Sequence, residues 1–138
     1  MVKVIIAEDD LAIAALLKEA LEASGYEVCG IADTVAGAIE LCNRTRPDQA
    51  IIDMRLADDG CGMDVAAGIA HRETISILYA TGNAGYSLLT AADGEACITK
   101  PYHAGDLLRA LQIVAEIKRH GTASRPFPTN FQVLRPAP

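Results

Sequence analysis

Short apolar runs alternate with amphipathic segments along most of the chain. Runs that are rich in β-branched residues and apolar at consecutive positions are typical of strands buried on both faces of a parallel sheet. Five such runs predict strands at Val2–Ala7, Glu27–Ala32, Ala50–Asp53, Ile75–Thr81 and Glu95–Lys100.

Between these runs, apolar residues recur at the helical period. They predict helices at Leu11–Ala23, Thr34–Arg46, Met63–Glu73 and Ala104–His120, with a further short helix in Gly82–Asp93. Asp9 or Asp10 is placed to cap the first helix, and Gly25 is placed to end it. The helix in Gly82–Asp93 is expected to be weak because glycines near its start disfavour helix.

The regular alternation of strands and helices indicates an α/β fold. Helices that connect parallel strands by right-handed crossovers cover both faces of the sheet. We therefore predict a doubly wound, five-stranded parallel sheet of the flavodoxin-like order 2-1-3-4-5, with five helices. In this order the first and third strands lie where the winding reverses, and ligands bind beyond their carboxyl ends.

The pattern stops after His120. The segment Gly121–Pro138 holds four of the six prolines and no periodic apolar positions. We therefore expect a folded domain over residues 1–120 and an extended tail over residues 121–138, without a second domain. Removing the tail after Gly121 is expected to leave the stability nearly unchanged unless Phe127 or Phe131 docks on the domain.

Composition narrows the classes of function. The 138 residues include 12 basic and 18 acidic side chains, which give a net charge of −6. This balance argues against a protein that binds nucleic-acid phosphates through a basic face. No apolar stretch approaches the roughly 20 residues of a membrane span, and the four cysteines show no metal-ligand spacing. We expect a cytoplasmic protein that binds neither nucleic acid nor a membrane.

Polar residues stand where four of the predicted strands end. Glu8 and Asp9 follow the first strand, Asp53 ends the third, Thr81 ends the fourth and Lys100 ends the fifth. Because these ends share one edge of the sheet, the side chains should converge. Clustered carboxylates favour a bound cation, and Mg²⁺ prefers such hard oxygen ligands. An aspartate can also attack a phosphoryl group while a metal and a lysine offset the developing charge.

Four segments in order, IIAEDD, AIIDMRL, ILYATGN and ITKPY, resemble the receiver (CheY-like) domain of bacterial two-component response regulators. The resemblance covers residues 3–120. It implies that Asp53 is the phosphoacceptor, that Lys100 pairs with the phosphoryl group and that Thr81 is the switch hydroxyl. It also implies that the Lys100–Pro101 bond is cis.

The same resemblance implies the ligands of a magnesium ion. Asp9 would bind the ion directly and Glu8 would bind it through water. Asp53 and the backbone carbonyl of Arg55 would complete the protein ligands.

The sequence departs from the usual receiver pattern at the positions of Cys97 and Ala57. Receivers usually carry an aromatic residue three positions before the lysine, where this chain has Cys97. They also usually carry a proline four residues after the phosphoacceptor, where this chain has Ala57, and the loop is about one residue longer. Without the aromatic, a switch would have to act through Thr81 and the segment Gly82–Asp93.

We therefore expect a stand-alone response regulator, without an output domain and without turnover as an enzyme. It would take its phosphoryl group from a histidine kinase or a phosphotransfer protein. It would then contact a downstream protein or pass the group on, and homodimer formation is left open. One alternative is an adaptor that works without phosphorylation. Another alternative is a phosphohydrolase with an aspartyl nucleophile. Such enzymes typically carry a second acid two residues after the nucleophile, and Arg55 at that position argues against this alternative.

Overall fold

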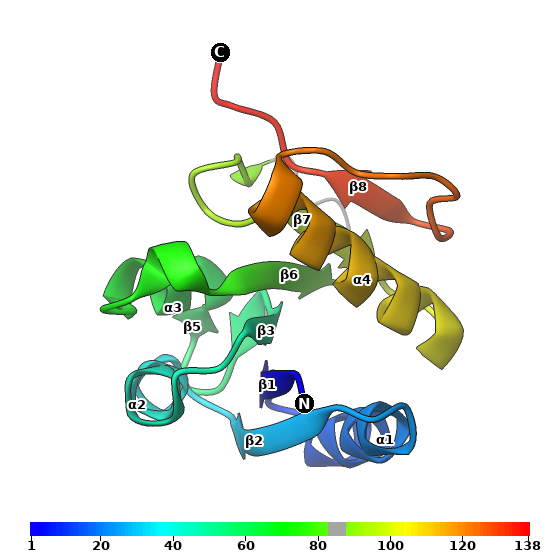
Figure 1. Cartoon of the computed structure of the whole chain (residues 1–138). Helices are drawn as coiled ribbons and strands as arrows, with labels where there is room; N and C mark the ends of the chain where they lie inside the picture. The colour runs from blue at the N-terminus through cyan, green and yellow to red at the C-terminus, as the bar shows by residue number, and fades with distance from the viewer. Residues whose placement is uncertain (83–87) are drawn as a thin grey trace.

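One central sheet organises the protein. The computed structural model describes the chain except residues 83–87 (Figure 1). The sheet has the order β2-β1-β3-β6-β7-β8. Its strands are β1 (Lys3–Ala7), β2 (Glu27–Ala32), β3 (Gln49–Asp53), β6 (Ser76–Thr81), β7 (Ala96–Thr99) and β8 (Phe131–Val133). The first five strands are parallel and confirm the predicted doubly wound order. The sixth, β8, is an addition that we did not predict.

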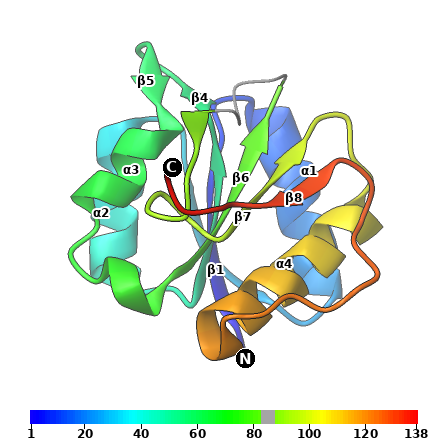
Figure 2. The same cartoon turned by 90° about the horizontal axis from the view of Figure 1, so that it is seen from above.

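Helices cover both faces of the sheet, two on each side (Figures 1 and 2). On one side lie α1 (Leu11–Ala23) and α4 (Ala104–His120), and on the other lie α2 (Val35–Thr45) and α3 (Gly62–Gly68). The strand side chains alternate between these layers. Ile6 and Leu78 pack with α1 and α4, whereas Ile5, Ile52 and Tyr79 pack with α2 and α3. Burial on both faces explains why the strands are continuous apolar runs rather than alternating ones.

The third predicted helix ends earlier than expected. The prediction ran from Met63 to Glu73, but α3 stops at Gly68 and only Arg72–Thr74 form a further 3₁₀ turn. Ile69 adopts an extended backbone and is buried in the core. The amide of Ala70 then donates to Asn43 Oδ1 of α2 at 2.9 Å, so this amide has a hydrogen-bond acceptor although it is not part of a helix.

The fourth predicted helix, in Gly82–Asp93, lies partly outside the described residues. Leu89–Asp93, which the structure does describe, form a turn in which the Thr90 amide donates to Asp93 Oδ2 at 2.8 Å. The described residues therefore contain four α-helices rather than the predicted five.

The loop after β3 contains a small hairpin. The strands β4 (Arg55–Leu56) and β5 (Gly60–Cys61) pair antiparallel. Asp58 and Asp59 at its tip have φ values of 61° and 57°, which aspartate tolerates better than most residues.

The C-terminal tail is docked on the domain. The strand β8 pairs antiparallel with the edge of β7, and the Leu134 amide donates to the Glu95 carbonyl at 3.0 Å. The Leu134 side chain is 6% exposed and packs in the core with Tyr79 and Cys97. The sequence left open whether the tail docks, and its contribution to stability stays a prediction. A strand of three residues is too short to produce a recognisable period in the sequence. In the structure, β8 covers an edge of the sheet that would otherwise be open.

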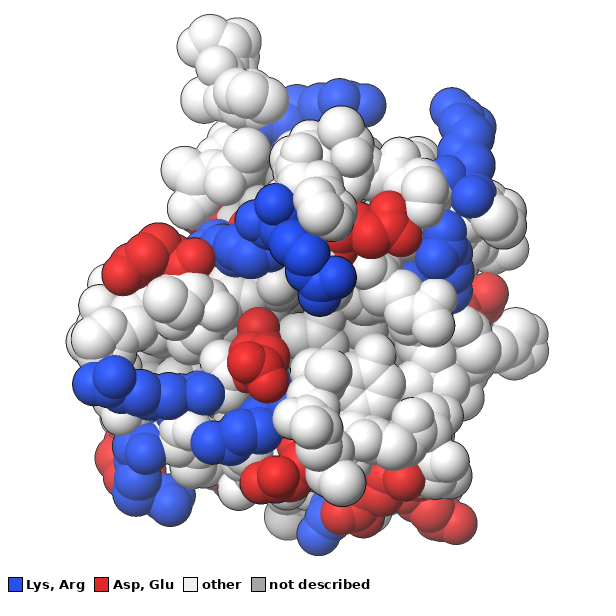
Figure 3. All heavy atoms as spheres, in the orientation of Figure 1, with Lys and Arg blue, Asp and Glu red and all other residues white. Residues whose placement is uncertain are grey.

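None of the helices in the described part of the chain is long and apolar enough to cross a membrane. On the face shown in Figure 3, basic and acidic side chains are interspersed.

The docked tail should contribute to stability. Leu134→Ala is expected to lower the free energy of unfolding by about 2 kcal/mol, because it removes a buried side chain and leaves a cavity. Leu16→Ala is the matched control, since Leu16 is 68% exposed on α1 and its truncation should cost less than about 0.5 kcal/mol. Urea denaturation of both variants measures the difference. Equal values would show that the tail does not add to the folded core.

Candidate functional site

All six residues predicted for the site line one pocket of about 730 Å³ at the carboxyl edge of the sheet. Because the parallel strands end at this edge, their last residues meet although they are far apart in the sequence. The lining consists of Glu8, Asp9, Asp10, Ile13, Asp53, Met54, Arg55, Thr81, Gly82, Leu88 and Lys100. Sequence reasoning did not include Ile13 and Leu88, whose apolar side chains carry no chemical signal of a site.

An ammonium group bridges two buried carboxylates in this pocket. Lys100 Nζ lies 2.6 Å from Asp53 Oδ2 and 3.4 Å from Glu8 Oε2. The two carboxylate side chains are only 7% and 4% exposed. Burial lowers the pKa of Lys100, but the hydrogen bond to Asp53 and the two negative charges outweigh it and raise the pKa. The lysine therefore stays charged and offsets the acidic cluster.

The site raises the pKa of the buried acid Glu8. Burial and its hydrogen bond with Asp53 raise the pKa of Glu8 to about 7, against the opposing effects of the Asp10 amide and Lys100. The Asp10 amide donates to Glu8 Oε1 at 3.1 Å. A buried carboxylate of this kind is stabilised in its charged form by a nearby cation.

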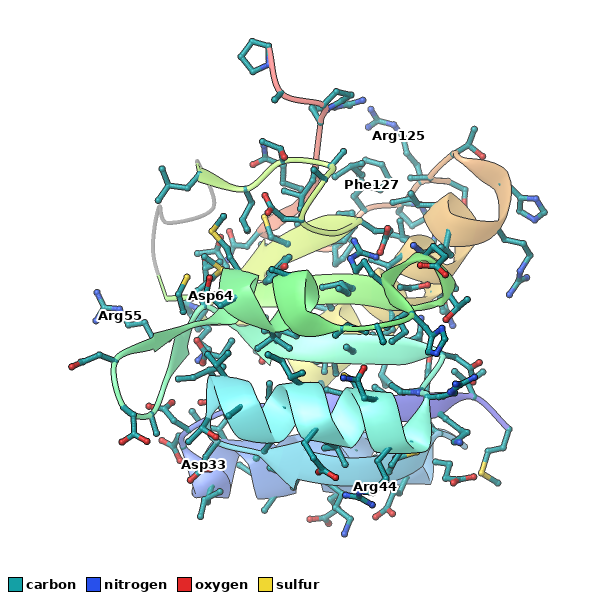
Figure 4. All side chains as sticks on the ribbon, turned by 90° about the vertical axis from the view of Figure 1, so that its left-hand side faces the viewer. Asp33, Arg44, Arg55, Asp64, Arg125 and Phe127 are labelled. Atoms are coloured by element: carbon teal, nitrogen blue, oxygen red, sulfur yellow. The ribbon has the colours of Figure 1, made fainter. Side chains whose placement is uncertain are left out.

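Asp53 is held in place by the chain around it. Its Oδ1 accepts the Arg55 amide at 2.9 Å, and its Oδ2 accepts the Lys100 ammonium. Gly62, at the start of α3, lies against the main chain of Asp53 so closely that a Cβ atom would collide with the Asp53 carbonyl oxygen. The side chain of Arg55 extends away from the body of the protein (Figure 4), so its charge is not part of the acidic cluster.

The acidic cluster can accommodate a metal ion. Glu8, Asp9 and Asp53 each offer a carboxylate oxygen, and these oxygens lie within 4.8 Å of one another. Three hard oxygen donors at the mouth of a pocket suit Mg²⁺, which keeps waters as its other ligands. Asp9 is exposed, so its oxygens face the open side of the pocket.

Asp10 has a different role from Asp9. Its Oδ1 accepts the amides of Ala12 and Ile13 at 3.0 and 3.2 Å and so caps α1. The sequence left open which of the two aspartates is the cap, and the structure identifies Asp10.

The ends of β6 and β7 are tied together at the pocket. Thr81 is 1% exposed, and its carbonyl accepts the Lys100 amide at 2.7 Å. The Lys100–Pro101 peptide bond is cis, as the resemblance implied. Cys97, three residues before the lysine, is 1% exposed and packs with Tyr79, Leu89 and Leu134 on the opposite face from α4.

Comparison with known proteins agrees with this geometry. Residues 4–112 match the family model of the response regulator receiver domain. The transcriptional regulatory protein PdtaR of Mycobacterium tuberculosis is 32% identical over 124 residues, which are 88% of this chain and 60% of PdtaR. The acid tolerance regulatory protein ActR of Rhizobium meliloti is 35% identical over 111 residues, 78% of this chain and 56% of ActR. The chain thus spans less than two thirds of these relatives.

Solved structures show the same fold. A CheY-like receiver domain protein from Methanospirillum hungatei superposes with a TM-score of 0.76 at 26% identity, covering 88% of this chain and 99% of that one. The non-phosphorylated HemR receiver domain from Leptospira biflexa superposes with a TM-score of 0.72 at 31% identity, covering 91% and 98%.

Magnesium binding should depend on Asp9 and not on Asp10. Asp9→Ala removes one of three carboxylates and is expected to weaken Mg²⁺ binding by at least about tenfold, or about 1.4 kcal/mol. Asp10→Ser keeps a side-chain oxygen at the helix cap and should change the affinity by less than about twofold. Calorimetric titration with MgCl₂ tests both variants. A larger loss in Asp10→Ser would mean that Asp10, not Asp9, belongs to the metal site.

Proposed function

The chain belongs to the response regulator receiver domain family, and we propose that it accepts a phosphoryl group on Asp53 from a phosphohistidine of a partner protein, with Mg²⁺ bound beside it. The observation that carries this proposal is the contact of 2.6 Å between Lys100 Nζ and Asp53 Oδ2, within reach of the Glu8 and Asp9 carboxylates. A carboxylate that is buried, oriented by the Arg55 amide and flanked by a cation is prepared to act as a nucleophile.

In the proposed transfer, a carboxylate oxygen of Asp53 forms a bond to phosphorus as the bond from phosphorus to the imidazole nitrogen breaks. The imidazole leaves with the electron pair of that bond. Lys100 offsets negative charge on the phosphoryl oxygens, and the Thr81 hydroxyl donates to one of them. Glu8, Asp9 and Asp53, with the Arg55 carbonyl, would hold Mg²⁺, which supplies further charge neutralisation.

A partner has an apolar surface to contact beside this pocket. A groove of about 430 Å³ runs between α1 and the start of α4, lined by Ile13, Leu16, Leu17, Ala20, Lys100, Pro101, Tyr102 and Ala104. Ile13 and Lys100 line both the groove and the acidic pocket. A helix of a histidine kinase or phosphotransfer protein that docks here would bring its histidine to the edge of the pocket. This adjacency supports phosphotransfer between proteins as the function.

Two alternatives have less support. A phosphohydrolase with an aspartyl nucleophile would need a second acid near Asp53, but the side chain two residues on is Arg55, and it points away (Figure 4). An adaptor that works without phosphorylation would not need Lys100 and three carboxylates in one pocket. We therefore propose a phosphoacceptor rather than a turnover enzyme.

The signal would pass on through contact with a downstream protein or by onward phosphotransfer. Action as a regulator in the cytoplasm remains our prediction, and the four free cysteines are consistent with a reducing compartment.

Phosphorylation should occur at Asp53 alone. With acetyl phosphate and Mg²⁺, the wild-type protein is expected to gain the mass of one phosphoryl group, and Asp53→Asn is expected to gain none. Asp59→Asn is the matched control: Asp59 is exposed in the neighbouring hairpin, and asparagine tolerates its φ of 57°. Intact-mass spectrometry at low temperature measures the label. Equal labelling of wild type and Asp53→Asn would disprove the assignment, and labelling that persists in EDTA would disprove the role of the metal.

A further inference from the structure

The C-terminal tail contacts the chain on both sides of Lys100. The Thr99 amide donates to the Asn130 carbonyl at 3.0 Å, and Asn130 Nδ2 donates to the Pro101 carbonyl at 3.3 Å. The residue between these two contacts, Lys100, is the one whose ammonium reaches Asp53. Asn130 has a φ of 62°, a left-handed conformation that asparagine adopts more easily than most residues and that places both its polar groups at this loop.

The tail is anchored at two further places, so Asn130 is not part of a loose end. Near its beginning, the Ser124 amide and hydroxyl donate to the Glu116 carboxylate at 3.0 and 2.7 Å, while Arg109 of α4 donates to the Ser124 and Pro126 carbonyls. Beyond Asn130, β8 pairs with β7 and Leu134 is buried. The tail runs along α4 and returns beside β7 (Figures 1 and 2). The Phe127 ring packs against the Phe131 ring at a tilt of 58°, and the Arg125 guanidinium lies over the Phe127 ring.

We propose that Asn130 is a positioning residue of the acidic site: it fixes the main chain on both sides of Lys100 and thereby sets the approach of the lysine ammonium to Asp53. On the other side, the Lys100 amide is held by the Thr81 carbonyl. Hydrogen bonds to β6 and to the tail thus hold the main chain at Lys100, and the lysine side chain is left to adjust its position to a phosphoryl group. This inference rests on the proposed function, in which Lys100 offsets the charge of that group.

Loosening this contact has a defined kinetic consequence. Asn130→Gly keeps the left-handed backbone accessible but removes the donor to Pro101. Phosphorylation of Asp53 by acetyl phosphate is expected to slow by about fivefold, the factor that corresponds to one hydrogen bond of net ~1 kcal/mol. The affinity for Mg²⁺ should not change, because the proposed metal ligands follow β1 or lie in β3 and β4, and none of them is in the tail. A variant that merely destabilised the fold would lose magnesium affinity and thermal stability together with rate.

The matched control is Gln132→Ala. It truncates an exposed side chain of β8 and keeps the backbone pairing with Cys97, so its rate should equal that of the wild type. Asn130→Asp is the second test variant. It also tolerates the left-handed backbone but cannot donate to Pro101 when ionised, and it should be slow like Asn130→Gly.

Linkage predicts a reciprocal effect. If the tail contact changes the affinity of the site for a bound phosphoryl mimic, the mimic must change the tail contact by the same free energy. Adding beryllofluoride with Mg²⁺, as a mimic of the phosphoryl group, should change the hydrogen exchange of the Thr99 amide in the wild type, and it should change it less in Asn130→Gly.

The outcomes separate this inference from the proposed function. Wild-type labelling with equal rates for Asn130→Gly, Asn130→Asp and Gln132→Ala would overturn the positioning role alone. A rate loss accompanied by an equal loss of magnesium affinity would show a general structural effect and would also overturn it. Failure of the wild type to accept a phosphoryl group would overturn the proposed function, and the positioning role with it.

Discussion

Two buried carboxylates at one edge of the sheet are the constraint on which the rest of the structure depends. Burying a charge away from water is costly unless the charge is paired and hydrogen-bonded. Among the described residues, Lys100 pairs with both Glu8 and Asp53, and it directly follows β7, which lies two strands away from β3 in the sheet. The compensation works only if β1, β3, β6 and β7 keep their order and register. The apolar strands that fix this register therefore serve the site as much as the core.

Negative charge is in excess at this edge of the sheet, and this excess favours the binding of a cation in the pocket. The Lys100 ammonium contacts the carboxylates of Glu8 and Asp53, a third carboxylate, that of Asp9, lies beside them, and burial raises the pKa of Glu8 to about 7. A divalent cation would complete the neutralisation. A phosphoryl group that approaches Asp53 would then meet positive charge from Lys100 as well as from the metal.

The sequence predicted those parts of the fold that follow from burial. Strands covered on both faces must be apolar throughout, so β1, β3 and β6 could be recognised, and the polar residues at their ends marked the pocket. The prediction failed where a local tertiary contact decided the outcome. Asn43 of α2 receives the Ala70 amide and Ile69 enters the core, so the third helix ends early although its sequence could continue. The strand β8 forms by pairing with β7, and a run of three residues is too short for its hydrophobic pattern to predict that pairing. The roles of the site residues came from the resemblance, and the geometry brings those residues together without testing their roles.

The small side chain of Cys97 and the docking of the tail are connected through packing. Cys97 and Leu134 belong to the same buried cluster, so the tail supplies apolar volume beside the position where related domains carry a ring. A ring that swings between two positions needs space at this edge of the sheet, and here β8 and Leu134 occupy the neighbouring edge of β7. The docked tail therefore holds the main chain on both sides of Lys100 through Asn130, while Leu134 fills the core beside Cys97, so packing and hydrogen bonds fix the edge of the sheet next to the acidic pocket together.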